Sequence, residues 1–115
     1  MIKKRPFIDH LILELFEVPL KLERIEDIDL KIKHFVKKCK LIVVKEEGHN
    51  FTPFGFTKIF VLSESHIIFH SWPEKNYLSI DLMSCKKLIE YKKIKKMAEE
   101  IFNTREIKLR KVRYN

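Results

Sequence analysis

Three apolar, strand-like segments follow one another in the middle of this chain with very little between them. They cover residues 54–62, 66–72 and 77–83. Ser63-Glu64 is the turn after the first, and the turn-forming run Pro73-Glu74-Lys75-Asn76 separates the second from the third. Strands joined by such short turns must be antiparallel neighbours in one sheet. The middle of the chain therefore predicts a three-stranded antiparallel unit.

The flanking residues add further strands and two amphipathic helices. Aliphatic and aromatic runs predict strands at 7–16, 41–44 and 106–112. Gly48-His49-Asn50 predicts a turn, and apolar residues three or four positions apart predict helices over 20–38 and 86–102. The expected order is strand, helix, four strands, helix, strand. Two helices on one face of a mostly antiparallel sheet make an α+β fold, a two-layer α/β sandwich.

Several strands are apolar on both of their faces, which bears on the oligomeric state. Ile59-Phe60-Val61-Leu62 and Ile67-Ile68-Phe69 contain no polar residue at all. A sheet with one face in water would alternate apolar and polar residues. We therefore expect the second face of the sheet to be covered, most simply by another copy of the chain in a homodimer.

Length, charge and cysteine content limit the class of protein. A chain of 115 residues forms a single domain, spanning 1–115. It has no apolar stretch of membrane-spanning length and no signal-peptide cleavage site, so we expect a cytoplasmic protein without a membrane partner. The net charge of +8 leaves RNA or DNA binding open as an alternative. The lysines of 86–100, however, share a helical pattern with glutamates, which is typical of a solvated helix face, so we expect no nucleic-acid partner.

One segment of the chain concentrates reactive side chains in a fixed order. Glu64-Ser65-His66 is followed by an apolar run, by His70-Ser71-Trp72-Pro73-Glu74, and then by Asp81 and Cys85. Upstream lies Phe51-Thr52-Pro53-Phe54-Gly55-Phe56-Thr57. In order and spacing, this set closely resembles the processing segment of the small, prokaryotic type of S-adenosylmethionine decarboxylase, a family of pyruvoyl-dependent enzymes. The resemblance extends over nearly the whole chain and is most specific from Phe51 to Cys85.

The resemblance implies that the chain cuts its own backbone between Glu64 and Ser65, giving a β chain, 1–64, and an α chain, 65–115. Ser65 Oγ would attack the Glu64 carbonyl carbon, with Thr57 and a neighbouring backbone N–H stabilising the oxyanion. His70 would remove the Ser65 α-proton, and residue 65 would become a covalent pyruvoyl group, a bound form of pyruvate. That group forms a Schiff base with the substrate amine and accepts the electrons released with carbon dioxide. Cys85 would then donate a proton to the substrate carbon.

The resemblance also implies a substrate, S-adenosylmethionine, whose decarboxylated form is the aminopropyl donor in polyamine (spermidine) synthesis. Glu74 would bind the ribose hydroxyls, and Phe51 and Phe7 would hold the adenine. The family builds its active site at or near a homodimer interface. Lys86, however, stands where the family has Gly, and Ser71 stands where Thr is more common. Two alternatives therefore remain: a relative that decarboxylates arginine or ornithine, and an unprocessed, non-catalytic homologue that acts as a binding or regulatory partner.

Antiparallel register predicts how these side chains are arranged. The turn before residue 77 places Cys85 opposite Glu64 or Ser65, and the turn at 63–64 places Thr57 opposite His70. Directly opposed residues lie within about 5.5 Å, so we expect the hydroxyls, the thiol and the imidazole to converge on one small region. Ser65 and His70 would face opposite sides of a regular strand, because an odd number of positions separates them. We therefore predict an irregular, strained backbone at Glu64-Ser65.

The remaining histidines and the second cysteine have no motif of their own. His66 follows Ser65 and is interpreted as structural. His10, His34, His49 and Cys39 are interpreted as structural or surface residues. Neither cysteine has metal-ligand spacing around it, so we expect no metal site.

Overall fold

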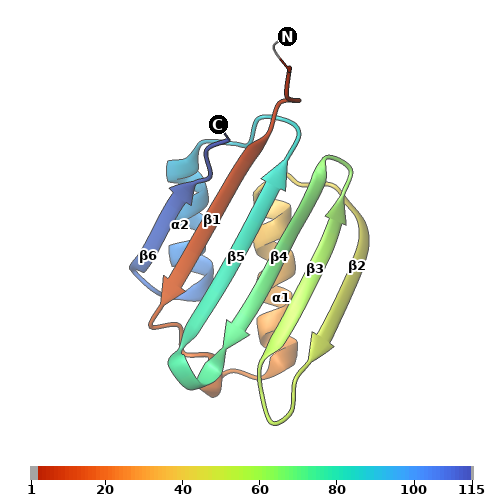
Figure 1. Ribbon diagram of the computed structural model, residues 1–115. Coiled ribbons are helices and arrows are strands. Elements are labelled where there is room, and N and C mark those ends of the chain that lie inside the picture. The colour runs from red at the N-terminus through yellow and green to blue at the C-terminus, as the bar shows by residue number, and fades with distance from the viewer. Residues whose placement is uncertain (1–2, 115) are drawn as a thin grey trace.

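The computed structural model describes residues 3–114, which form one six-stranded sheet backed by two helices (Figure 1). The strands are β1 (Asp9–Phe16), β2 (Val43–Asn50), β3 (Phe56–Leu62), β4 (Ser65–Trp72), β5 (Tyr77–Ser84) and β6 (Glu106–Lys111). The helices are α1 (Ile25–Lys38) and α2 (Tyr91–Phe102), and short 3-10 turns form at η1 (Leu20–Leu22) and η2 (Pro73–Lys75). Both helices lie behind the sheet in Figure 1, so the predicted α+β two-layer sandwich is confirmed.

The sheet has the order β2-β3-β4-β5-β1-β6, and every neighbouring pair is antiparallel. The predicted unit β3-β4-β5 lies at its centre, in the expected register: Thr57 pairs with His70, and Ser65 pairs with Ser84. β1 is inserted between β5 and β6. The two helices provide the long connections, α1 from β1 to the edge strand β2, and α2 from β5 to the other edge strand, β6.

The hydrophobic core lies between the sheet and the helices. β1 and β5 alternate between buried and half-buried residues, as strands with one face in the core do. Their buried aliphatic side chains are Leu11, Leu13, Leu15, Leu78, Ile80 and Leu82. Aromatic rings join the layers: the Phe35 ring of α1 lies 6.2 Å from that of Phe69 on β4 and 5.7 Å from that of Phe102 on α2. Phe60 of β3 packs edge-on against Phe69 at 6.0 Å.

Two predicted boundaries at the β2 end of the sheet are wrong. Gly48-His49-Asn50 is not a turn but the last part of β2, which pairs with β3 along its length. The turn follows at 51–55 and closes on Gly55, which has φ +100°. A Cβ at Gly55 would lie 3.3 Å from the Ser71 carbonyl oxygen, so glycine also permits a close approach to β4. The predicted helix 20–38 is likewise shorter, since α1 begins at Ile25.

Helix α2 begins at Tyr91 and not at residue 86, because a buried carboxylate binds the loop that precedes it. Asp9, at the start of β1, is 4% exposed and accepts the Leu88 N–H at 2.9 Å. The Tyr91 hydroxyl donates to the same carboxylate. Leu88 is buried, but it reaches the core from the loop and not from the helix. This contact joins residues far apart in sequence, so helical periodicity alone could not reveal it.

The sheet face opposite the helices, here called the open face, is bare in Figure 1. Its side chains are the alternate residues of the strands, and most of them are only half-buried. The apolar ones are Ile12, Phe16, Ile59, Val61, Ile68 and Met83. The strands are therefore apolar on both faces, as predicted. Within residues 3–114, no helix is long and apolar enough to cross a membrane.

We expect Phe69→Ala to lower the free energy of unfolding by about 3–5 kcal/mol, because Phe69 is fully buried and its loss leaves a cavity between two other rings. Urea denaturation followed by circular dichroism measures the change. Leu22→Ala is the control, since Leu22 is 87% exposed and its truncation should cost less than about 0.5 kcal/mol. Equal losses in the two variants would contradict this assignment of the core.

Candidate active site

The turn between β3 and β4 distorts the backbone at the predicted cleavage position. Ser63 and Glu64 form a two-residue turn that closes on the pair Leu62 and Ser65. Ser65 has φ +148°, a backbone conformation that residues with a side chain rarely adopt. Such a conformation costs on the order of 1–3 kcal/mol and persists only where the surrounding structure enforces it. The predicted irregularity at Glu64-Ser65 is confirmed.

The carbonyl group of the Glu64-Ser65 bond already has a hydrogen-bond donor. The backbone N–H of Cys85 donates to the Glu64 carbonyl oxygen at 2.8 Å, because β5 ends directly opposite the turn. A donor in this position polarises the carbonyl and can stabilise negative charge on its oxygen when a nucleophile attacks. The hydroxyl of the next residue, Ser65, is the nearest nucleophile in sequence.

The Glu64 side chain contacts the two residues that follow β5, Cys85 and Lys86. The Cys85 thiol donates to Glu64 Oε2 at 3.3 Å, and Lys86 Nζ lies 3.2 Å from Oε1. The hydrogen bonds from Cys85 and Lys86 lower the pKa of Glu64. In turn, the hydrogen bond to the Glu64 carboxylate raises the pKa of the Cys85 thiol, so this thiol keeps its proton at neutral pH. A proton donor needs that protonation state.

The sequence had not predicted a role for Lys86 in this contact. Its only signal was the departure from the family pattern directly after Cys85. Cys39 differs from Cys85 in its surroundings, since it is 2% exposed and burial, not a carboxylate, raises its pKa to about 12. It is therefore an unreactive core thiol, in agreement with its structural interpretation.

A second group of predicted site residues lies at the other end of β4. Thr57 Oγ1 is 2.9 Å from His70 Nδ1, across the β3–β4 pair, so the predicted Thr57–His70 contact is confirmed. The Trp72 ring lies 5.9 Å from the His70 ring. Glu74 follows on η2, and Phe51, which is 51% exposed, follows the end of β2. Together these residues present an imidazole, a hydroxyl, a carboxylate and aromatic rings at one end of the sheet.

The predicted convergence of all these groups within one chain is wrong. Ser65 is the first residue of β4 and His70 the sixth, and five steps along a strand span about 16 Å. In Figure 1, the β3–β4 turn lies at one end of the sheet, while η2 and the β2–β3 loop lie at the other. The distorted backbone at Ser65 redirects one residue but does not shorten the strand. We call the two groups the cleavage end (Glu64, Ser65, Cys85) and the histidine end (Thr57, His70).

Phe7 lies apart from Phe51. It precedes β1, whose Asp9 pairs with Ser84, so it belongs to the cleavage end of the sheet. It is 58% exposed and lines a hollow with Leu88 and Tyr91, beside the loop that leads into α2. The structure thus brings Glu64, Ser65 and Cys85 together, and Thr57 and His70 together, but it does not bring the two proposed adenine-binding rings together.

Comparison with known proteins shows the family of this chain. A family model described as S-adenosylmethionine decarboxylase matches residues 9–114. An S-adenosylmethionine decarboxylase proenzyme of Clostridium botulinum is 36% identical over 102 residues, which cover 86% of this chain and 88% of that protein. This chain belongs to the S-adenosylmethionine decarboxylase family. The resemblance predicted from the segment Phe51 to Cys85 is therefore confirmed.

Other members of the family are more distant. An S-adenosylmethionine decarboxylase proenzyme of Sulfurihydrogenibium sp. is 35% identical over 77 residues, or 66% of this chain and 58% of that protein. The crystal structure of the adenosylmethionine decarboxylase from Aquifex aeolicus matches with a TM-score of 0.79 over 95% of this chain and 91% of that one. The two sequences are 24% identical, so this match supports the fold.

We expect Glu64→Gln to make the Cys85 thiol more reactive, in a Ser65→Ala background that keeps residue 64 joined to the chain. The carboxylate raises the pKa of the thiol, so a neutral amide lets that pKa fall and the thiolate fraction rise at mildly alkaline pH. The rate of alkylation by iodoacetamide measures this fraction. Glu47→Gln is the matched control, since Glu47 lies on β2 beside Lys45 and leaves the thiol untouched. Equal alkylation rates in both variants would refute the contact.

Proposed function

We propose that this chain is a self-processing, pyruvoyl-dependent decarboxylase of S-adenosylmethionine. It would cut itself between Glu64 and Ser65 into a β chain, 1–64, and an α chain, 65–115, and act in the cytoplasm in polyamine synthesis. One observation carries the proposal: the distorted Ser65 follows a carbonyl that already accepts a hydrogen bond from the Cys85 N–H. Membership in a family whose relatives are named proenzymes supports the same reaction.

The processing reaction follows from these contacts. Ser65 Oγ would attack the Glu64 carbonyl carbon and the peptide nitrogen would leave, so that an ester replaces the amide. The Cys85 N–H lies on the oxygen that gains negative charge. A base then removes the Ser65 α-proton, and the bond between Ser65 Cβ and Oγ breaks. This step frees the main-chain carboxylate of Glu64. Water then displaces the nitrogen that remains on residue 65, which releases ammonia and leaves the pyruvoyl group. Strain at Ser65 raises the energy of the starting peptide and so favours the first step.

The residues around position 65 fit such a group. A pyruvoyl ketone supplies an electron sink for the carbanion that loss of carbon dioxide leaves. Cys85 lies opposite the Glu64-Ser65 turn with its thiol protonated by the influence of Glu64, as a proton donor must be. Glu74 on η2 and Phe51, both at the histidine end of the sheet, would bind the ribose hydroxyls and the adenine.

A second copy of the chain would complete the site. Residue 65 needs a base, and the His70 of its own chain lies about 16 Å along the strand. When two sheets pack through their open faces about a twofold axis perpendicular to the strands, their strands run in opposite directions. The cleavage end of one copy then lies over the histidine end of the other. The apolar side chains of the open face supply the surface for such a homodimer.

Purified protein should run as two fragments on a denaturing gel and release carbon dioxide from S-adenosylmethionine. Ser65→Ala should give one full-length band and no carbon dioxide, because it removes the nucleophile and the source of the pyruvoyl group. Ser63→Ala is the matched control, since it changes the neighbouring hydroxyl in the same turn and should cut normally.

Three outcomes would favour the other hypotheses. Release from arginine or ornithine, but not from S-adenosylmethionine, would make the chain an amino-acid decarboxylase of the same family. A single band under all conditions would indicate an unprocessed binding or regulatory homologue. Salt-sensitive retention on DNA, with no cleavage, would favour the nucleic-acid alternative that the charge leaves open.

Co-expression of the Ser65→Ala and His70→Ala chains tests the shared site. Each variant alone should stay uncut, because one lacks the nucleophile and the other the base. In a mixed dimer, the intact His70 of the first chain would serve the intact Ser65 of the second. With random pairing, about half of the His70→Ala chains should then be cut, and none of the Ser65→Ala chains. If both stay intact on a denaturing gel, His70 does not act across an interface.

A further inference from the structure

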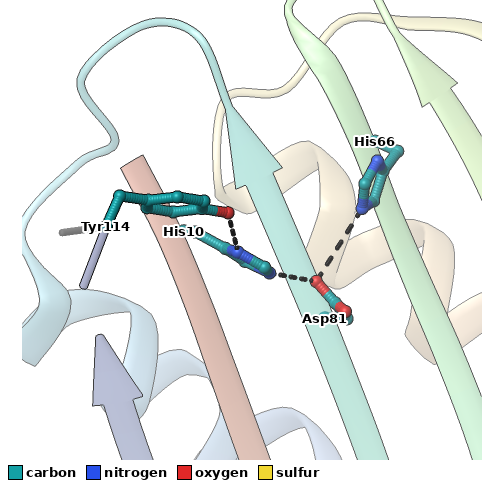
Figure 2. Close-up of polar contacts among 4 residues, drawn as sticks. All are labelled: His10, His66, Asp81 and Tyr114. Atoms are coloured by element: carbon teal, nitrogen blue, oxygen red, sulfur yellow. Dashed lines mark hydrogen bonds and ion pairs between the residues drawn. The ribbon is translucent and has the colours of Figure 1, made fainter. Parts of the chain in front are cut away.

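Three strands and the residues that follow β6 bring four polar side chains together on the open face near the cleavage end. Figure 2 shows Asp81 of β5 between His10 of β1 and His66 of β4, with Tyr114 on the far side of His10. His10 Nε2 lies 2.7 Å from Asp81 Oδ1, and His66 Nε2 lies 3.8 Å from the same oxygen. Tyr114 has its hydroxyl 2.7 Å from His10 Nδ1. The proposed chemistry uses none of these side chains.

The His10 ring is fully bonded whatever its charge. The Asp81 carboxylate can only accept, so Nε2–H of His10 donates to it. The other nitrogen, Nδ1, accepts the Tyr114 O–H when the ring is neutral and donates to the Tyr114 oxygen when it is charged. The Tyr114 ring also stacks on the imidazole, with centroids 6.0 Å apart. The side chain of His10 is only 15% exposed, so its orientation and that of Asp81 are fixed together.

The fourth member, His66, is the residue to which the pyruvoyl group would be attached. After the proposed cut, residue 65 is the first residue of the α chain, and it is joined to the protein only through the backbone nitrogen of His66. Free ends of strands open with little free-energy cost unless side chains hold them. The His66 side chain, 33% exposed, has Nε2 3.8 Å from Asp81 Oδ1, which is longer than a hydrogen bond, so the two form an ion pair when the imidazole is protonated.

We propose that His10, Asp81 and Tyr114 form a positioning network that holds His66 and thereby fixes residue 65, first as the attacking serine and then as the pyruvoyl end of the α chain. The inference rests on the proposed function. His10 would belong to the β chain, whereas Asp81, Tyr114 and His66 would belong to the α chain, so the network would also join the two products. None of these residues touches the reacting atoms, and all act through the placement of residue 65.

Asp81→Asn tests the network, because it removes the charge and keeps the shape. In cleaved protein, hydrogen exchange of the amides of 66–69 should become about tenfold faster. The kcat for S-adenosylmethionine should fall about 10- to 100-fold, while KM stays within about twofold, because a small displacement of a reacting group slows the chemical step. Slower self-cleavage would be a further expected effect. Tyr114→Phe should give the same pattern to a smaller extent, and it carries the test if Asp81→Asn does not fold.

The matched control is Asp29→Asn on the helix side of the sheet. Asp29 also has two partners, Lys58 Nζ at 2.9 Å and Lys33 Nζ at 3.0 Å, so its loss weakens the fold without reaching the open face. In the Asp29→Asn variant, hydrogen exchange of the amides of 66–69 and the kcat should stay at the wild-type values. Wild-type behaviour of both Asp81→Asn and Tyr114→Phe, or an equal loss in Asp29→Asn, would overturn the network. A wild-type chain that never cuts itself would instead refute the proposed function, and exchange at 66–69 of the uncut chain would still test the network.

Discussion

The two-residue turn between β3 and β4 is the constraint on which the rest of this structure depends. It fixes the register of β3 with β4, and the next turn fixes that of β4 with β5. Because of this register, the end of β5 lies opposite Glu64, where the Cys85 N–H meets its carbonyl oxygen. The same tightness forces Ser65 into its unusual backbone conformation. One short turn therefore supplies both the distortion and the hydrogen bond that the cleavage chemistry requires.

Local features of the sequence predicted which strands pair, whereas contacts between residues distant in sequence were not predicted. Short turns restrict the register, so the sequence alone placed Cys85 opposite Glu64 or Ser65 and Thr57 opposite His70, and the structure selects Glu64 for Cys85. The start of α2 was missed, because a buried carboxylate from the other end of the chain decides it. Ser65 and His70 do not converge for a simpler reason: register decides which residues lie opposite each other, but five positions along the same strand still separate these two by about 16 Å. Contacts between residues that are distant in sequence, such as His10 with Asp81, have no periodic signal.

Glu64 shows how one residue can serve two steps of a reaction sequence. Its carbonyl belongs to the bond that would be cut, while its carboxylate keeps the Cys85 thiol protonated. Lys86 shares that carboxylate and, as a cation, works in the opposite direction on the thiol. The balance between the two depends on the residue that follows Cys85, which is where this chain departs from the family pattern. The departure therefore bears on the protonation of the Cys85 thiol.

The order of the strands has a consequence for what happens once the backbone is broken after residue 64. The first fragment would hold β1, β2, β3 and α1, and the second would hold β4, β5, β6 and α2. In the sheet, the strands of the two fragments are interleaved, since β1 of the first fragment lies between β5 and β6 of the second. The fragments are thus interlocked, and pulling them apart would break two ladders beside β1 as well as the β3–β4 ladder and the shared core. Cleavage would therefore break one covalent bond and leave the fold intact. The two fragments could separate only if both unfolded.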